Sequence, residues 1–378
     1  MVARSRMGGP WSRAQRVARA FQDGGHEVVL AWGDDGNCSD PGGPTLEIPV
    51  PSPLGLPDAI ARHTFPLASR LGLMGRKPVR SFEEVLWLTG ALDERYTRAA
   101  VEVLRTHMRA TRPDVVYSEF NLAAIIAARA EGIPCVGSGS QPTTTSYASN
   151  PRKSAGIQRL LREMGMPAPA SSLTVLEGMR RRFIPSCPTL EPWAGERAVY
   201  CGFLDEPPAL TPTPRDCVLV YLGAGSVPAG VAIRAGQELA DALGCDVYVA
   251  GVPEAVRISG GYTVACAPRF DFAELLPRAR VFVHHGGQNS MMDALSYEVP
   301  QVLVPGRVFE RQFNAEAVES ARCGLTVREP KPTLIARAAR RLVVDEPALT
   351  SGIRGLRAEL SSLGGTKRIV REVEKLVS

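Results

Sequence analysis

Short apolar runs alternate with amphipathic, helix-like segments along most of the chain. Residues 217–222 and 281–283 are continuously apolar, which is typical of strands in a parallel sheet that is covered on both faces. The N-terminal half repeats the pattern with a strand at 113–118, a helix of small apolar residues at 122–130 and a strand at 133–137. This alternation predicts an α/β fold with parallel sheets.

The same patterns predict the remaining elements. In the N-terminal half we expect a helix at about 12–22, strands at 26–32 and 45–50, and one long helix at 83–111. In the C-terminal half we expect helices at about 229–243, 272–276, 333–344, 349–363 and 366–376, and strands at 245–250, 262–265, 301–304 and 324–327. The last helix is amphipathic, because Ile369, Val370 and Val373 fall on one side.

The length of 378 residues suits two domains better than one core. Residues 205–215 hold four prolines and no apolar periodicity, which is typical of a stiff, extended linker. We therefore expect an N-terminal domain at 1–204 and a C-terminal domain at 216–364, followed by a terminal helix at 365–378.

Composition narrows the class of protein. A net charge of +5 spread over this length does not indicate a nucleic-acid binder. The eight cysteines are scattered singly without a C-x-x-C pair, so we expect buried free thiols in a reducing cytoplasm and no zinc site. The apolar runs are too short to cross a bilayer, which favours a cytoplasmic protein.

One stretch carries candidate chemistry. The predicted strand 281–283 leads through His284 and His285 into a turn at Gly286 and Gly287, and a helix follows. Such a turn presents backbone N–H groups and the positive end of a helix dipole, which suit a phosphate or pyrophosphate. His285 could add a proton donor or a positive charge. A glycine turn that merely ends a strand is the common alternative.

The order H-G-G-x-N-S-x-x-D-A-L at 285–295 resembles the nucleotide-sugar signature of GT-B glycosyltransferases of the UDP-glycosyltransferase type. The resemblance is strong over about 217–330 and weaker over 1–205. It implies two Rossmann-like domains facing a central cleft, with the last helix crossing back to the first domain. It also implies an inverting transfer from a nucleoside diphosphate sugar, held by the second domain, to a small-molecule acceptor held by the first. No metal or further cofactor is expected.

The resemblance also implies roles for individual residues in the donor site. The glycine turn and the first residues of the helix would bind the diphosphate, and Asp293 would contact the ribose. Phe270 or Phe272 would stack on the base, and Glu310 with either Arg311 or Gln312 would contact the sugar. The full donor set is Gly223, Gly225, Ser226, Phe270, Phe272, His285, Gly286, Gly287, Gln288, Asn289, Ser290, Asp293, Glu310, Arg311 and Gln312.

The acceptor side departs from the family pattern. Pro10 occupies the place where the family usually has a histidine that acts as general base. Glu119 follows a predicted strand where the family usually has an aspartate that orients that histidine, and we hypothesise that it has taken over the base role, directly or through a water. A helix cap is the plainer interpretation of Glu119. Residues 1–4 leave barely the end of a first strand, so we expect the sequence to begin a few residues short of it.

Two other functions stay open at this point. A non-catalytic homologue that activates a partner glycosyltransferase would explain Pro10, and a nucleotide-sugar 2-epimerase would share the phosphate site. The donor motif argues against the first, and the scarcity of histidines, five in all, argues against the second. The mixed apolar and basic segment 54–80 could contact a lipid-linked acceptor or a membrane surface, but a helix packed on its own domain is favoured.

Overall fold

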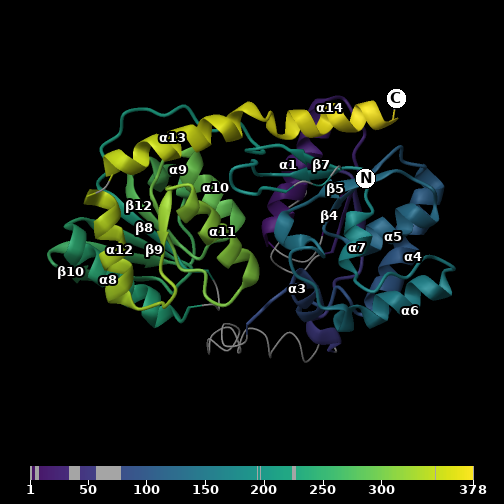
Figure 1. Cartoon of the computed structure of the whole chain (residues 1–378), viewed down its shortest axis with the longest axis horizontal. Coiled ribbons are helices and arrows are strands. Elements are labelled where there is room, and N and C mark those ends of the chain that lie inside the picture. The colour runs from purple at the N-terminus through teal and green to yellow at the C-terminus, as the bar shows by residue number, and fades with distance from the viewer. Residues whose placement is uncertain are drawn as a thin grey trace. The chain divides into compact units, whose positions relative to one another are not determined.

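The computed structural model describes residues 2–4, 8–33, 43–56, 78–193, 195, 197–223, 227–344 and 346–377 (Figure 1). Most of segment 54–80, and both Gly225 and Ser226, lie outside the described residues. Contacts divide the chain into two compact units. Unit 1 contains the described residues up to 56, then 80–206 and the segment from Ser361, and unit 2 contains 78–79 and 207–360.

Unit 1 is built on a parallel sheet with the strand order β3-β2-β1-β4-β5-β6-β7. The order reverses between β1 and β4, and in such sheets ligands bind at the carboxyl ends of the strands beside this point. The strands are β1 Val2–Arg4, β2 Leu30–Trp32, β3 Thr45–Glu47, β4 Val116–Glu119, β5 Cys135–Ser138, β6 Arg182–Ile184 and β7 Ala198–Tyr200.

Helices α1 and α14 cover one face of this sheet. Trp11 and Val17 of α1 and Ile369 of α14 share a buried cluster with Tyr117 and Phe183 of the strands. The helices of unit 1 are α1 Gly8–Asp23, α3 Phe82–Leu88, α4 Glu94–Thr111, α5 Leu122–Ala130, α6 Ala155–Glu163, α7 Leu173–Glu177 and α14 Gly365–Val377, with short 3-10 turns at Pro53–Gly55, Gln141–Thr143 and Pro151–Ser154.

The single helix predicted at 83–111 is wrong, because the chain forms α3 and α4 there. Gly90 has a φ of 81°, and a Cβ on it would stand 1.9 Å from the carbonyl oxygen of Ser52. Asp93 then caps α4 by accepting a hydrogen bond from the backbone N–H of Tyr96 at 3.0 Å. The close approach of another segment interrupts the helix.

Unit 2 has the strand order β10-β11-β9-β8-β12-β13-β14, which reverses between β8 and β12. The strands are β8 Cys217–Tyr221, β9 Asp246–Ala250, β10 Ala255–Ser259, β11 Tyr262–Ala267, β12 Ala279–His284, β13 Gln301–Leu303 and β14 Gly324–Thr326. The helices are α8 Ala229–Leu243, α9 Phe272–Leu275, α10 Gln288–Ser296, α11 Phe309–Ser320, α12 Pro332–Val344 and α13 Glu346–Ser362, with a 3-10 turn at Leu276–Arg278. The pattern did not predict β10, which pairs antiparallel with β11 at the sheet edge.

The helices of unit 2 lie on both faces of its sheet (Figure 1). Helices α8 and α12 pack on one face through a buried aliphatic cluster that includes Val220, Leu239 and Ile335. Helices α9 and α10 pack on the other face through Leu275, Ala294 and other buried residues. The predicted α/β fold of two Rossmann-like sheets is confirmed.

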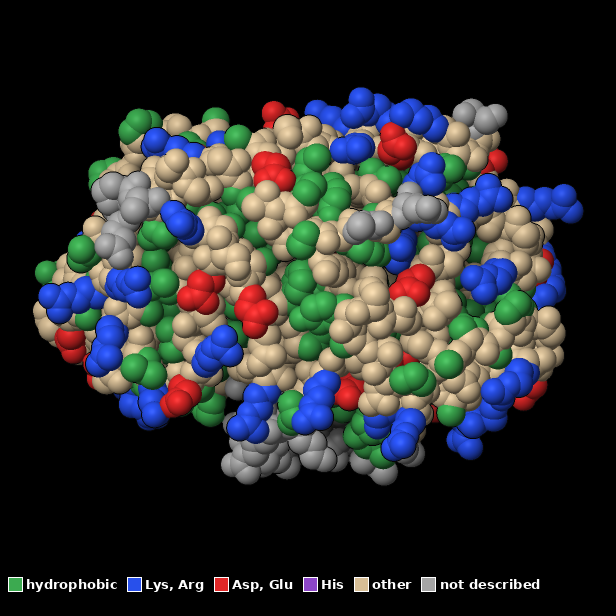
Figure 2. Space-filling model, viewed as in Figure 1, with side chains coloured by type: hydrophobic (Ala, Val, Ile, Leu, Met, Phe, Trp, Pro, Cys, Tyr) green, Lys and Arg blue, Asp and Glu red, His purple; other side chains and the backbone are tan. Residues whose placement is uncertain are grey.

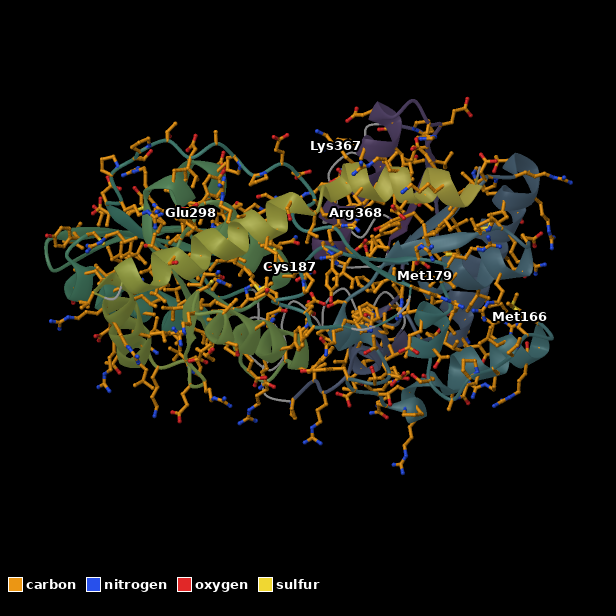
Figure 3. The ribbon with its side chains drawn as sticks, turned by 45° about the horizontal axis from the view of Figure 1, so that its top comes forward. Met166, Met179, Cys187, Glu298, Lys367 and Arg368 are labelled. Atoms are coloured by element: carbon orange, nitrogen blue, oxygen red, sulfur yellow. The ribbon has the colours of Figure 1, made fainter. Side chains whose placement is uncertain are left out.

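The last two helices belong to different units, α13 mainly to unit 2 and α14 to unit 1. Glu298, labelled in Figure 3, forms an ion pair with Arg354 of α13 at 3.2 Å, and Arg357 donates a hydrogen bond to the carbonyl of Ser296 at 3.0 Å. Lys367 and Arg368, labelled in Figure 3, lie in the first turn of α14, which packs against α1. Its outer side carries Lys and Arg side chains, visible as a blue row in Figure 2.

The seven cysteines that the structure describes are buried and form no disulfide bond, as predicted for them; Cys38 lies outside the described residues. Burial raises the pKa of Cys135 and Cys323 to about 12, so these thiols are inert. No helix in the described part of the chain is both long enough and apolar enough to span a bilayer.

Candidate functional site

The glycine turn lies at the carboxyl end of β12, beside the point where the strand order of unit 2 reverses. Gly286 has a φ of 82°, a left-handed conformation that favours glycine. Gly287 is the N-cap residue of α10 and has no side chain that could cap the helix. The first turn of α10 is therefore a natural place for an anion, as the sequence indicated.

His284 holds the backbone of this turn in place through a side-chain hydrogen bond. Its Nδ1 accepts a hydrogen bond from the backbone N–H of Gly286 at 3.1 Å, so its Nε2 carries the proton and donates to Gln301 Oε1 at 2.9 Å. Burial lowers the pKa of His284 to about 4. The ring is thus a neutral structural part of the site, and neither it nor Gln301 was predicted as one.

His285 faces the neighbouring strand. Its backbone N–H and its Nδ1 lie 3.2 and 3.4 Å from the carbonyl oxygen of Tyr221. Burial, and next the positive charge of Arg311, lower the pKa of His285 to about 3. His285 is therefore neutral at pH 7 in this structure, and the positive charge considered from the sequence is absent because of this environment.

Two glycines let the imidazole of His285 occupy its place. A Cβ on Gly287 would stand 2.5 Å from Nε2 of His285, and a Cβ on Gly223 would stand 3.2 Å from Nδ1. Gly223 also has a φ of 74° at the end of β8. The structure therefore brings together three of the predicted donor residues, Gly223, His285 and Gly287.

Helix α11 also contacts the glycine turn. Asn314 is buried and donates a hydrogen bond from Nδ2 to the carbonyl oxygen of Gly286 at 2.8 Å. The backbone of Arg311 is close enough that a Cβ on Gly286 would stand 3.0 Å from its carbonyl oxygen. Glu310 is half-buried beside it, whereas Gln312 is exposed and donates to the carbonyl of Gly306 at 3.0 Å. Arg311 and Gln312 are the two candidates for the position that a sugar-binding glutamine occupies in the family motif. Of these two residues, only Arg311 lies at the glycine turn.

The remaining donor candidates lie on α10 and among aromatic rings. Ser290 is buried, and Gln288, Asn289 and Asp293 are half-buried on α10. Phe270 packs edge-on against Tyr248 at 5.5 Å, and Phe272 packs likewise against Tyr221 at 5.8 Å. Because Tyr221 also contacts the ring of His285 at 5.2 Å, Phe272 is connected to the glycine turn through Tyr221.

Glu119 lies at the end of β4, next to β1, where the strand order of unit 1 reverses. It is fully buried, and its Oε1 lies 2.6 Å from Nε of Arg13. Its Oε2 accepts a hydrogen bond from the hydroxyl of Ser138, which is 2.9 Å from that of Tyr117. With both oxygens engaged and no exposed surface, Glu119 has the geometry of a positioning residue, which disfavours direct proton removal.

At the position where the family usually has a catalytic histidine, this chain has residues that pack in the core of unit 1. Pro10 is buried in α1, and Trp11 next to it stacks on Trp32 with ring centroids 5.5 Å apart. Phe120, which follows Glu119, has a φ of 57° and packs edge-on against Phe82. A bulky residue in the left-handed region marks this strand end as strained, which is common at functional sites.

Several positioning residues escaped prediction because their partners are distant in sequence. Arg13 and Glu119 are 106 residues apart, and Asn314 and Gly286 are 28 apart. Among the described residues no group of three or more His, Cys, Asp and Glu side chains could hold a metal ion.

The chain is similar in sequence to known proteins. Residues 245–376 match the family described as the C-terminal domain of erythromycin biosynthesis protein CIII-like proteins. The NDP-glycosyltransferase YjiC of Bacillus subtilis is 28% identical over 102 residues, which cover 27% of this chain and 26% of that protein. The elloramycin glycosyltransferase ElmGT of Streptomyces olivaceus is 27% identical over 292 residues, covering 73% of this chain and 70% of that protein.

A likeness also extends over the whole fold. The spinosyn rhamnosyltransferase SpnG superposes with a TM-score of 0.70 and 15% identity, covering 99% of each chain. Structures of that protein with spinosyn aglycone and with thymidine diphosphate are similar to this chain as well. At this identity the likeness establishes the fold, which is GT-B.

Proposed function

We propose that this chain, a GT-B protein of the UDP-glycosyltransferase type with an erythromycin CIII-like C-terminal domain, moves a sugar from a nucleoside diphosphate sugar to a small-molecule acceptor of secondary metabolism. The observation that carries the proposal is the glycine turn between β12 and α10, shaped by His284 and Asn314. It offers backbone donors where the leaving diphosphate would develop charge.

The reaction we propose inverts the anomeric carbon and uses no metal. The acceptor oxygen forms a bond to that carbon while the bond to the diphosphate oxygen breaks, and the hydroxyl proton of the acceptor passes to solvent. The first turn of α10 would stabilise the departing diphosphate. Turnover should therefore continue when divalent cations are chelated, and a loss of turnover on chelation would contradict this part of the proposal.

The fate of the acceptor proton sets a preference among acceptors. Since both oxygens of Glu119 are engaged by Arg13 and Ser138, we propose that the acceptor hydroxyl is acidic enough, like a phenol, to react without a strong base. Phenolic acceptors should then react much faster than aliphatic alcohols of similar shape. Equal rates for both, with Glu119→Gln abolishing turnover, would restore Glu119 as the base.

A panel of nucleoside diphosphate sugars tests the proposed function directly. Binding is scored by the rise in melting temperature and slow hydrolysis by the released diphosphate, with nucleoside monophosphates as controls. At least one donor should stabilise the protein and release diphosphate. No response to any donor would favour a homologue without catalytic activity.

A further inference from the structure

Arg311 stands at an unusual place for a cation. It is the third residue of α11, and its backbone packs on the turn residue Gly286. The first turn of a helix carries positive partial charge and normally attracts acidic residues, so a guanidinium there is unfavourable by itself. Arg311 is also partly buried, and this burial lowers the pKa of its guanidinium.

The surroundings of Arg311 combine the positive end of a second helix with one acidic residue. The amino end of α10 faces the same glycine turn, and His285 lies close enough that the charge of Arg311 lowers its pKa. Glu310 is the acidic residue in the first turn of α11, and it favours the charged form of Arg311. Two helix ends and one guanidinium meeting at a turn form a site that an anion would stabilise.

His285 is poorly suited to bind that anion alone. Its Nδ1 lies 3.4 Å from the carbonyl of Tyr221, which requires the proton on Nδ1. Its Nε2, the nitrogen beside Gly287, then holds a lone pair that would repel a phosphate oxygen. The groups facing the imidazole are Arg311 from α11, His284 from β12 and Tyr221 from β8, and none is an anion that would favour its protonation.

We propose that Arg311 supplies the fixed positive charge of the donor site and binds the diphosphate of the nucleotide sugar. The inference rests on the proposed function and adds the residue that carries the charge. The diphosphate is favoured over the sugar as its partner, because the backbone of Arg311 contacts Gly286 and its charge acts on His285, both in the turn where the diphosphate would lie. A guanidinium can also bind two phosphate oxygens at once.

Calorimetric titration with uridine and thymidine diphosphates, free of sugar, tests the inference on the full chain. Arg311→Gln should weaken the better ligand by about 10- to 100-fold, the loss of a charge-assisted contact, and Arg311→Lys should recover part of it. His285→Ala should weaken it less than Arg311→Gln does. Arg340→Gln, which removes an exposed arginine from α12, should leave affinity unchanged.

The outcomes separate the inference from the proposed function. If the wild-type protein binds neither diphosphate, the proposed function fails. If it binds one and folded Arg311→Gln binds equally well, only the inference fails. A loss confined to donors with a carboxylated sugar would place Arg311 at the sugar and would also overturn it.

Proton uptake provides a second readout. An intact nucleotide sugar has no group that titrates near pH 7, so uptake on binding reports the protein. Titrations of the best-binding nucleotide sugar in buffers of different ionisation enthalpy should give close to zero protons at pH 7.5. Uptake of close to one proton would mean that His285 becomes the cation, which contradicts the inference.

Discussion

At the scale of single residues, His284 and His285 are adjacent in sequence and differ in surroundings. His284 is enclosed between Gly286 and Gln301, whereas His285 borders the turn and Gly223. Both are held neutral by burial, and their pKa values fall to about 4 and about 3. A sequence can show that two histidines end a strand, but the protonation state depends on neighbours that folding brings together.

These lowered pKa values make stability depend on pH. Above the unfolded value of about 6.5 both histidines are neutral in either state, so they contribute no pH dependence. As the pH falls below 6.5, both histidines become protonated in the unfolded chain but stay neutral in the native state. The free energy of unfolding therefore decreases until the pH reaches the folded pKa of His284, which is about 4. His284 alone should account for about 3 kcal/mol at most.

Urea unfolding at pH 7.5, 6 and 5 measures this dependence. The wild-type protein should lose stability at each step, and His284→Gln should show a shallower loss. Identical slopes in the two proteins would show that His284 titrates normally in the native state.

The buried pair of Arg13 and Glu119 is expected to matter for stability. Arg13→Met leaves the carboxylate of Glu119 buried without its cation, which should cost about 3–5 kcal/mol. The double variant Arg13→Met with Glu119→Gln removes both charges and should recover much of that loss. Chemical denaturation of the wild-type protein, the two single variants and the double variant measures the coupling, and an additive loss in the double variant would mean that the pair is not coupled.

At the scale of elements, the glycine turn between β12 and α10 depends on the absence of side chains. Gly287 has a φ of −68°, which alanine also adopts, so Gly287→Ala should fold with little change in stability. Its Cβ would meet Nε2 of His285 at 2.5 Å and force the imidazole aside. Donor affinity should fall by about 10-fold or more, a cost of at least about 1.4 kcal/mol.

Gly355 provides the matched control for this change. It lies in α13, and a Cβ on it would meet nothing within 4 Å. Gly355→Ala should leave donor affinity unchanged and raise stability by about 0.4–1 kcal/mol. Titration of both variants decides the point, since equal affinities in Gly287→Ala and Gly355→Ala would mean that the position of His285 is irrelevant to the donor.

Elements were predictable where the signal is local. Apolar strands followed by glycine turns identified β8 and β12 and the helix α10, and the small apolar residues of α5 gave its bounds. The break between α3 and α4 was missed because it depends on Gly90 meeting the carbonyl of Ser52, a contact between distant segments. For the same reason, no local pattern predicts that Asn314 of α11 contacts Gly286.

At the scale of the whole molecule, each unit places its candidate residues where its own strand order reverses. His285 and Gly223 lie at the ends of β12 and β8 in unit 2, and Glu119 lies at the end of β4 in unit 1. The family resemblance anticipated this assignment because the motif and the strand that precedes it are contiguous in sequence. The network around Glu119 was not anticipated, since Arg13 and Ser138 approach it from other elements.

The central claim is that the β12–α10 turn in unit 2 binds the diphosphate of the donor. Hydrogen–deuterium exchange of the full chain, with and without a nucleoside diphosphate at saturating concentration, tests it most directly. Amides of residues 286–291 and of the first turns of α11 should become protected in the wild-type protein. At a ligand concentration near the wild-type Kd, Gly287→Ala should show much less of this protection. Protection confined to unit 1, or unchanged exchange at 286–291 despite measurable binding, would contradict the claim.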